Sequence, residues 1–277
     1  MFRGGAMNQC KLYKYKKFDG QLLEMLAKKE VYYSDPKRFN DPLDCKPEFH
    51  IDTDSRTLER LCLKIGFSQD DISRVDYMSH EPVDYTEHLK YRDLLLCEEI
   101  RRVIYEEMER YGILSLSETP LSMLMWSHYG DQHKGLCIEY NYEIDGNLPP
   151  KVKYDRPRII NVSDIVRWKL DGCKESRDRV FETFFFVKAP GWEYESERRH
   201  VVEGLQGKCF SQHHRISAVY FGIRWGKIGD VPRNRYPRAI CEVASLLALP
   251  VDSFFSNGEC QRDLSPIRGH RVIECCP

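Results

Sequence analysis

Residues 84–117 read DYTEHLKYRDLLLCEEIRRVIYEEMERYGILSLS, and their hydrophobic period changes from helical to extended near residue 112. Asp84, with Glu87 three positions later, matches the capping-box pattern at the start of a helix. Gly112 suits the left-handed residue that often ends a helix. The alternation in residues 113–117 predicts a strand. Four apolar residues recur at four-residue spacing, as on one buried helical face: Leu96, Ile100, Ile104 and Met108.

The sequence on either side of this segment predicts short strands and further helices. We expect strands near these residues: Tyr13, Tyr32, Ser115, Ile138, His200 and Val219. Helical character is expected at 21–29, throughout 53–111, at 163–187 with a break at Gly172, and at 236–247, followed by a strand at 251–255. Short strands around one long helical block predict a single α+β domain over residues 1–277. Its sheet should be strongly bent and mixed or antiparallel, with residues of about 53–111 as a helical insert or cap.

Composition narrows the class of protein. The chain has 277 residues, 42% hydrophobic and 31% charged, with a net charge of −1, which is typical of a soluble globular protein and not of a globally basic nucleic-acid binder. No apolar run is long enough for a membrane span, and the first ten residues lack the apolar segment of a secretion signal. The eleven cysteines contain no CxxC pair, so we expect reduced thiols, a cytoplasmic location and no zinc site. Rossmann and P-loop phosphate motifs are absent from the sequence.

An aromatic and histidine-rich segment, residues 125–135, is the first candidate for a ligand site. Trp126 and Tyr129 could stack on a planar ligand, while His128, His133 or Lys134 would meet its charge. The alternative is an aromatic helix or loop that packs in the core. We expect residues from several motifs to line one concave pocket if a site exists: Tyr15, Asn40, His128 and Glu195.

Alternating carboxylates at residues 193–197 are the second candidate. In an extended strand, Glu193, Glu195 and Glu197 would share one face and raise one another's pKa unless a cation or ligand lies among them. A solvated acidic edge is the plain alternative. A carboxylate pair could instead act on an electron-poor sugar carbon, one stabilising its charge and the other deprotonating the acceptor. Arg198, next to Glu197, could tie that residue into a structural ion pair.

A basic loop is predicted in the last quarter of the chain. Five cations lie within fifteen residues that contain one acidic residue, Asp230: Arg224, Lys227, Arg233, Arg235 and Arg238. They could bind the phosphates of an RNA or DNA acceptor, or they could simply form a solvated surface loop.

The order of the motifs resembles a bacterial family labelled domain of unknown function 2971. The motifs are LYKY, YYSDPKRFNDPLDC, LSLSE, MWSHYGDQHKGLCIEY, YDRP and WEYESERR, and together they extend over about residues 11–222. The FNDP motif and the combination of MWSHY with HKG are the most specific of them. The family label itself implies no activity.

A second resemblance, to ADP-ribosyltransferase folds, does imply chemistry. Those enzymes set their NAD site with a basic or aromatic residue on the first strand, a Ser or Tyr on a following strand and a late Glu-x-Glu. Three elements of this chain are similar to that arrangement: Lys14 or Tyr15, then Tyr33 or Ser34, then Glu195 and Glu197. The first strand of this chain lacks the Arg or His of those enzymes, and the helical insert is an additional departure.

This second resemblance implies an enzyme that uses NAD as co-substrate to modify a nucleic acid or protein, as a toxin or anti-phage effector with an inhibitory, antitoxin-type partner. Glu195 and Glu197 would be catalytic. The residues expected to bind NAD are Lys14, Tyr15, Tyr33, Ser34, Trp126, His128 and Tyr129, with Tyr15, Tyr33 and Trp126 shaping the nicotinamide slot. Two alternatives stay open: a non-enzymatic nucleotide- or partner-binding module, and a metal-dependent nuclease using Asp41, Glu195 and Glu197.

Overall fold

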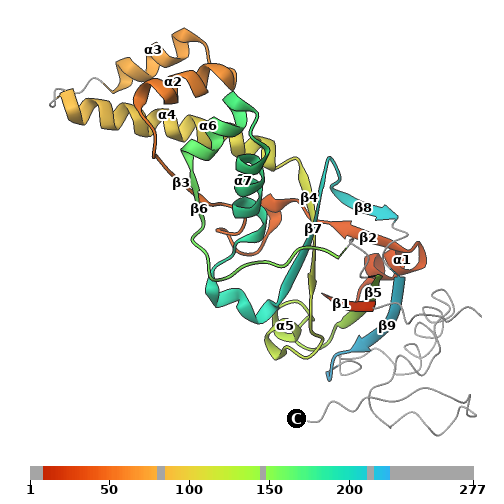
Figure 1. Cartoon of the computed structure of the whole chain (residues 1–277). Coiled ribbons are helices and arrows are strands. Elements are labelled where there is room, and N and C mark those ends of the chain that lie inside the picture. Colours follow the sequence, from red (N-terminus) through yellow and green to blue (C-terminus); the bar gives the residue numbers. More distant parts are fainter. Residues whose placement is uncertain (1–8, 80–84, 144–147, 211–214, 225–277) are drawn as a thin grey trace, which may run out of the picture.

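The main sheet of the computed structural model has five strands in the order β7-β4-β1-β5-β9, and every neighbouring pair is antiparallel (Figure 1). The structure describes residues 9–79, 85–143, 148–210 and 215–224. The strands of this sheet are β1 (Gln9–Lys16), β4 (Tyr111–Ser117), β5 (Leu136–Glu143), β7 (Glu197–Glu203) and β9 (Arg215–Phe221). The expected α+β class and antiparallel sheet are therefore confirmed. The helix and strand predicted within 236–255 lie outside the described residues.

The sheet divides between the central strand β1 and its neighbour β4. β1 pairs with β5 along its whole length, and β4 pairs with β7 along its whole length. By contrast, β1 and β4 share a single residue pair, Tyr13 with Ser117. Beyond that pair the two halves of the sheet diverge, which leaves room between them for a cavity.

The expected strand at Tyr32 exists but does not belong to the main sheet. β2 (Glu30–Tyr33) pairs with β8 (Gly207–Phe210), and Ser34, directly after β2, forms an isolated bridge with Ile113 of β4. The expectation of six strands in one sheet was therefore wrong, because a later segment of the chain supplies the partner of β2. A third, parallel pair joins β3 (Glu48–His50) to β6 (Ile159–Asn161).

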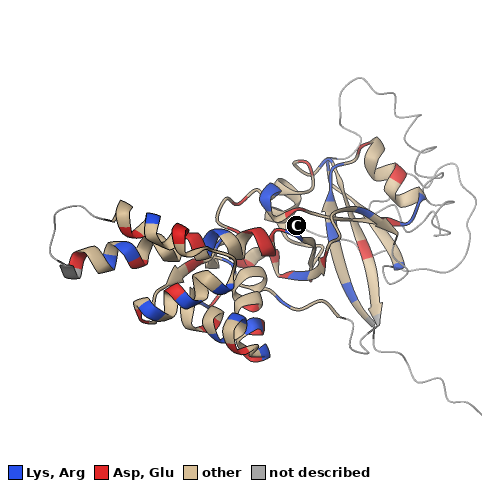
Figure 2. Cartoon of the chain, turned by 90° about the horizontal axis from the view of Figure 1, so that it is seen from above, with Lys and Arg blue, Asp and Glu red and all other residues tan. Residues whose placement is uncertain are grey.

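A helical lobe extends to one side of the sheet (Figure 1). It contains the predicted helices α2 (Ser55–Lys64), α3 (Gln69–Met78) and α4 (Tyr85–Met108). It also contains α6 (Val162–Asp171) and α7 (Lys174–Phe186), because α6 packs on both α2 and α7. Lys, Arg, Asp and Glu are interspersed along these helices (Figure 2). The lobe thus has a mixed charged surface around its own core.

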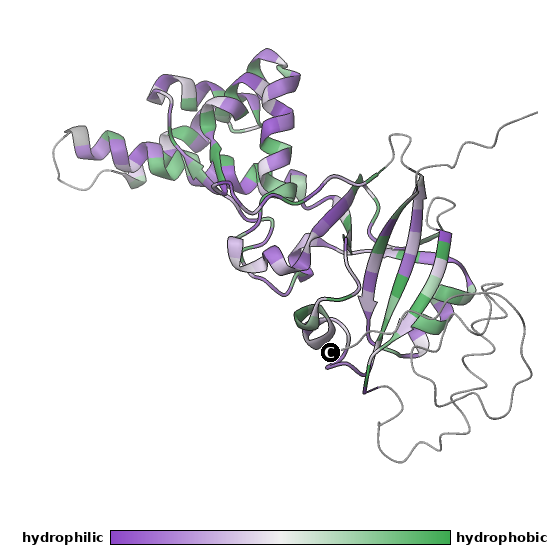
Figure 3. Ribbon diagram, turned by 60° about the horizontal axis from the view of Figure 1, so that its bottom comes forward, coloured by the Kyte–Doolittle hydropathy of each residue, from purple (hydrophilic) through white to green (hydrophobic). Residues whose placement is uncertain are grey.

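The apolar stripe of α4 forms part of that core. Leu96, Ile100, Ile104 and Met108 are all buried, as their spacing predicts, and they pack with residues of α2, α6 and α7. Asp84, the expected cap of this helix, lies outside the described residues. Figure 3 shows hydrophobic and hydrophilic residues alternating along the helices of the lobe and the strands of the sheet. This pattern is what one buried face per element requires.

Two glycines had predicted roles as helix ends, and one prediction was wrong. Gly172 has φ 69° and ends α6, as expected. Gly112, however, lies inside β4, and α4 already ends at Met108. A Cβ at Gly112 would lie 1.6 Å from the carbonyl oxygen of Leu205, so this glycine permits a close backbone approach instead of ending a helix.

The short elements around the sheet complete the described chain: α1 (Gly20–Ala27), the 3-10 turn η1 (Pro36–Arg38), α5 (Met123–His128) and the 3-10 turn η2 (Pro190–Glu195). No helix in the described ranges combines the length and the apolar composition needed to cross a membrane. The cysteines that the structure describes are all free, and four of them are buried: Cys45, Cys62, Cys97 and Cys137.

Candidate functional site

A cavity of about 360 Å³ lies where β1 and β4 diverge. This volume falls in the usual range of small-molecule sites, about 300–1,000 Å³. Residues of β1, the turn after β2, β4, α5, η2 and the first residue of β7 line it. The four residues expected to share a pocket all line it: Tyr15, Asn40, His128 and Glu195. The topology therefore brings together motifs that are far apart in the sequence.

Side chains, not strand pairing, bridge the divergence between β1 and β4. The ammonium of Lys14 donates to the carbonyl oxygen of Ser115 at 2.6 Å, and the hydroxyl of Tyr15 donates to the carbonyl oxygen of Thr119 at 2.8 Å. Lys14, Tyr15, Ser34 and Ser115 also line the cavity. β1 thus lines the cavity with the ammonium group of Lys14 and the aromatic ring of Tyr15.

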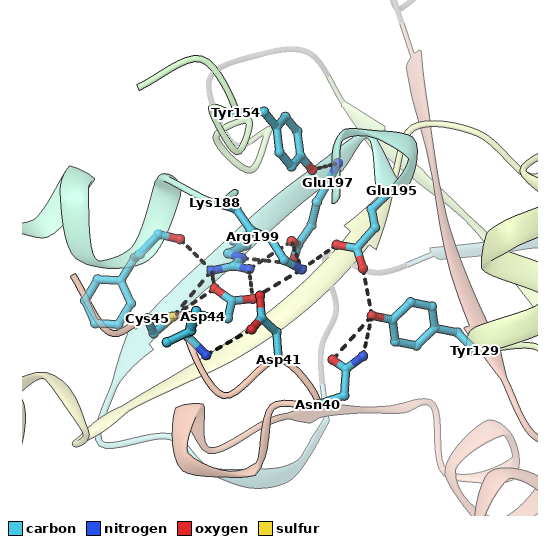
Figure 4. A network of polar contacts seen from close by, with 12 residues as sticks. Asn40, Asp41, Asp44, Cys45, Tyr129, Tyr154, Lys188, Glu195, Glu197 and Arg199 are labelled. Carbon is cyan, nitrogen blue, oxygen red and sulfur yellow. Dashed lines mark hydrogen bonds and ion pairs between the residues drawn. The ribbon is translucent and has the colours of Figure 1, made fainter. Parts of the chain in front are cut away.

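Two buried cations and three buried carboxylates form a cluster at the floor of this cavity (Figure 4). Lys188 lies among the carboxylates, with its Nζ 2.6 Å from Glu195, 3.2 Å from Asp44 and 3.6 Å from Glu197. Arg199 is fully buried and donates to both oxygens of Asp44, at 2.9 and 2.6 Å. Arg199 also donates to both oxygens of Glu197, at 2.8 and 2.9 Å. Each buried charge therefore has a charged partner, as the cost of desolvation requires.

The local backbone explains how Glu195 and Glu197 reach the same cluster. Glu195 ends the 3-10 turn η2, Ser196 is left-handed at φ 45°, and Glu197 begins β7. Glu193 is exposed on the turn. The expectation that three alternating glutamates share one face of a strand was wrong, because the chain bends at Ser196 before the strand begins.

Two residues next to Glu197, Arg198 and Tyr154, have contacts that the sequence did not predict. Arg198 does not pair with Glu197: β7 points it to the other side, where its Nε donates to Glu118 at 2.6 Å. The backbone amide of Glu197 donates to the hydroxyl of Tyr154, at 3.0 Å, which gives the YDRP motif a structural role (Figure 4).

The two glutamates differ in how their charge is compensated. Burial opposes ionisation of Glu197, but Arg199 and Lys188 outweigh it and lower the pKa of Glu197 to about 2. Burial raises the pKa of Glu195, and the negative charge of Glu197 raises it further against the opposing effect of Lys188. Glu197 is therefore a fixed anion, while Glu195 is the carboxylate that binds a proton more readily.

Glu195 is oriented by hydrogen bonds on both oxygens. Its Oε2 accepts from Lys188, and its Oε1 accepts from the hydroxyl of Tyr129 at 2.7 Å. The amide of Asn40 in turn donates to that hydroxyl at 3.1 Å (Figure 4). Asp41 has a different role, because its carboxylate accepts from the backbone amide of Leu43 at 2.9 Å and so holds the FNDP turn.

Lys14 is the third titratable group of interest in the cavity. Burial of its ammonium and the like charge of Lys16 lower the pKa of Lys14 to about 7, although Glu197 and Glu195 act in the opposite direction. A lysine with such a pKa changes its charge near neutral pH, which is unusual outside functional sites.

Two aromatic residues expected in the pocket lie elsewhere. Trp126 does not line the cavity; it packs edge-on against Tyr15, with ring centroids 5.1 Å apart, and its Nε1 donates to Pro120. Tyr33 is buried on the other side of the sheet, where its hydroxyl lies 2.6 Å from Nδ1 of His200. Tyr33 therefore does not line the cavity, although its neighbour Ser34 does. A role for Tyr33 in a nicotinamide slot is therefore corrected.

The HKG motif builds a turn next to the site. Asp131, Gln132 and His133 are consecutive left-handed residues, with φ of 49°, 54° and 66°. A Cβ at Gly222 would lie 2.2 Å from the carbonyl oxygen of His133, so this glycine leaves room for the turn. Left-handed non-glycine residues cost free energy and persist only where the surroundings fix them. The amides of Gln132 and His133 donate to the carbonyl oxygens of Ser127 and Trp126, at 3.3 and 3.1 Å, so the turn is tied to α5, which ends at His128, directly before Tyr129.

Sequence reasoning missed Asp44, Lys188 and Arg199 as members of the site. Asp44 and Arg199 lie inside motifs that were recognised, FNDPLDC and ESERR. Lys188 follows α7 and carries no local pattern; its position becomes meaningful only through the carboxylates around it.

Two further features were considered from the sequence, the basic loop and a metal site. Of the basic loop, only Arg224 is described, and it is exposed; Lys227, Arg233, Arg235 and Arg238 lie outside the described residues. Within the described ranges, no group of three or more His, Cys, Asp or Glu side chains has an arrangement that could hold a metal ion.

The fold and the site together define an α+β protein with a buried charged cluster in a divided antiparallel sheet. Residues 125–200, from α5 to β7, match the model of a family described as "Protein of unknown function (DUF2971)", so the resemblance seen in the motifs is confirmed over this segment. The segment includes Tyr129, Lys188, Glu195, Glu197 and Arg199. No curated protein and no solved structure matches the chain.

Proposed function

We propose that the protein is an ADP-ribosyltransferase-like enzyme that cleaves the nicotinamide–ribose bond of NAD and transfers ADP-ribose to a macromolecule. One observation carries the proposal: Glu195, with a raised pKa, and Glu197, with a lowered one, lie together at the floor of one cavity. Two carboxylates whose pKa values are pushed apart by their surroundings suit two different roles in one reaction.

The reaction assigns those roles as follows. The bond between C1′ of the ribose and the nicotinamide nitrogen breaks, its electron pair leaves with neutral nicotinamide, and positive charge develops on the sugar. Glu197, kept ionised by Arg199, stabilises that charge more in the transition state than in the ground state. A hydroxyl or amine of the acceptor then bonds to C1′, and Glu195 takes the proton that the acceptor loses.

The other cavity residues fit the substrate by their chemistry. Tyr13, Tyr15, Phe39 and Tyr129 provide aromatic surface for the nicotinamide, and Lys14 and Ser34 provide polar contacts near it. Trp126 supports this surface from behind Tyr15. The acceptor is a nucleic acid or a protein, and the proposed setting is a cytoplasmic toxin or anti-phage effector with an inhibitory partner.

The test is release of nicotinamide from NAD by the purified protein in the presence of cell extract, with labelling of the acceptor followed in parallel. We expect Glu195→Gln and Glu197→Gln to lower the rate by about 10²–10³, the usual loss for a group that stabilises transition-state charge. Glu193→Gln is the matched control, because Glu193 is exposed on the same turn as Glu195. A folded Glu195→Gln protein with the parental rate would overturn the proposal.

A non-enzymatic nucleotide-binding module is the second candidate, and one observation favours it. Asp44, Glu195 and Glu197 are all paired with Lys188 or Arg199, so the cluster is satisfied without a reaction. Such a module would be stabilised by NAD without consuming it. A ligand at 100 times its dissociation constant adds about 2.7 kcal/mol to the free energy of unfolding, which thermal unfolding would detect.

A further inference from the structure

The mouth of the cavity carries cations that lack ion-pair partners. Lys17 and Arg38 line the cavity and are exposed, whereas Lys16 also lines it but is half-buried, with its Nζ over the ring of Tyr32; no carboxylate of the described residues forms an ion pair with any of the three. Lys37, the neighbour of Arg38, behaves differently: it does not line the cavity, and its Nζ lies 2.7 Å from Glu109.

The charge of the cavity is therefore divided into two regions. At the floor, the three carboxylates outnumber Lys188 and Arg199 by one, and the remaining cation beside them is Lys14, whose pKa is lowered to about 7. At the mouth, Lys17 and Arg38 carry positive charges that form no ion pair with a carboxylate of the described residues. A ligand that complements both regions has an anionic group at one end and a group that is or becomes cationic at the other.

We propose that Lys17 and Arg38, with Lys16 beside them, form an anion subsite that binds the diphosphate of a dinucleotide whose adjoining ribose lies against Glu195. The assignment rests on the proposed function for the identity of the second end of the ligand. A guanidinium can bind two phosphate oxygens at once, and a lysine ammonium acts as a mobile point charge beside it.

The backbone supports a fixed position for Arg38. It is the last residue of η1, whose start is capped by the side chain of Asp35, and its backbone amide donates to the carbonyl oxygen of Asp35 at 3.0 Å. Lys17 directly follows β1, which is paired with β5 up to Lys16. Both cations thus belong to or directly follow ordered elements that line the same cavity, and both side chains are exposed.

The test is a titration of the full chain with ADP-ribose, in which calorimetry measures the heat of binding. We expect Arg38→Gln and Lys17→Gln each to raise the dissociation constant about tenfold, the loss expected for one charge-assisted hydrogen bond. Lys37→Gln is the matched control and should bind like the parent. Nicotinamide riboside has the sugar but no phosphate, so its binding should not distinguish the variants.

The outcomes separate this subsite from the proposed reaction. Binding of ADP-ribose that depends on Arg38 and Lys17, without cleavage of NAD, would support the subsite and contradict the reaction. Cleavage of NAD with equal ADP-ribose affinity for Arg38→Gln, Lys17→Gln and Lys37→Gln would overturn the subsite alone. The subsite is also overturned if the parent does not bind ADP-ribose, or if a 12-nucleotide single-stranded DNA shows the dependence on Arg38 and ADP-ribose does not.

Discussion

Arg199 holds Glu197 through two hydrogen bonds, from Nε at 2.8 Å and from Nη2 at 2.9 Å, although only one residue separates them on β7. Alternation along the strand puts both side chains on the same face, toward the cavity floor. Arg199 also donates to Asp44 and to the carbonyl oxygen of Phe185, so one buried guanidinium joins β7 to the FNDPLDC turn and to α7. The same residue therefore supports the fold and fixes the charge of the site.

Replacing this arginine should be strongly destabilising. Arg199→Met leaves two buried carboxylates without their main partner, and breaking a buried ion pair in this way costs about 3–5 kcal/mol of unfolding free energy. Urea unfolding followed by circular dichroism measures the change. Arg102→Met on α4 is the control, because that arginine pairs with Glu99 and Glu106 on an exposed face, where the loss is below about 1 kcal/mol. Equal losses for the two variants would contradict a central role for Arg199.

The ion pair also predicts how stability depends on pH. The pKa of Glu197 is about 2 in the folded protein and lies below that of an unfolded glutamate. Ionised Glu197 therefore contributes stability that is complete above about pH 5 and is lost as the pH falls toward 2. The difference in unfolding free energy between the parent and Glu197→Gln should shrink from pH 7 to pH 3 in urea titrations. A difference that stays constant from pH 7 to pH 3 would show that ionisation of Glu197 does not contribute to the free energy of unfolding.

The local sequence pattern was sufficient to predict most helices and strands, but it did not predict which distant segments they pair with or contact. The four-residue spacing from Leu96 to Met108 predicted a buried face because it depends only on helical geometry. Pairing of β2 with β8 could not be predicted, because the short strand at Tyr32 carries no information about which distant segment meets its edge. Gly112 was misassigned for a related reason: its requirement comes from Leu205, far along the chain.

In the candidate site, the sequence likewise identified some residues but did not predict how the fold places them. Glu195 and Glu197 were identified by their spacing, but their convergence depends on the left-handed Ser196, which the assumption of a regular strand hid. Tyr33 was an aromatic candidate on a strand that was predicted in the right place, but its side chain packs in the core beside His200 and does not line the cavity. Lys188 has no sequence signature, and only the fold places it among the carboxylates.

The close approach at Gly112 gives a third prediction. In Gly112→Ala the new methyl group would meet the carbonyl of Leu205 and the Cβ of Tyr33, at 1.6 and 2.9 Å, so backbone must shift. Overpacking of this kind costs about 1–3 kcal/mol or more. Gly20→Ala is the matched control, since no atom lies within 4 Å of its added Cβ. Thermal unfolding should show a lower midpoint for Gly112→Ala alone; equal midpoints would mean that β4 and the turn at Leu205 are not packed this closely.

The hydroxyl of Tyr129 gives the last prediction, because it tests the role of Glu195 through its pKa. This hydroxyl donates to Glu195 and favours the ionised carboxylate, so Tyr129→Phe should raise the pKa of Glu195 further. If ionised Glu195 accepts the proton of the acceptor, the acidic limb of the pH–rate profile for NAD cleavage should move to higher pH. The expected displacement is about one pH unit, which corresponds to about 1.4 kcal/mol.

Tyr15→Phe is the comparison for this experiment, because the hydroxyl of Tyr15 lies in the same cavity but donates to the backbone of Thr119 and to no carboxylate. Its pH–rate profile should keep the parental acidic limb, whatever its effect on the rate. A Tyr129→Phe profile that falls at the parental pH, with only a lower plateau, would mean that Tyr129 shapes the cavity and that a group other than Glu195 controls the acidic limb. A profile displaced to lower pH would contradict the direction in which the hydrogen bond acts.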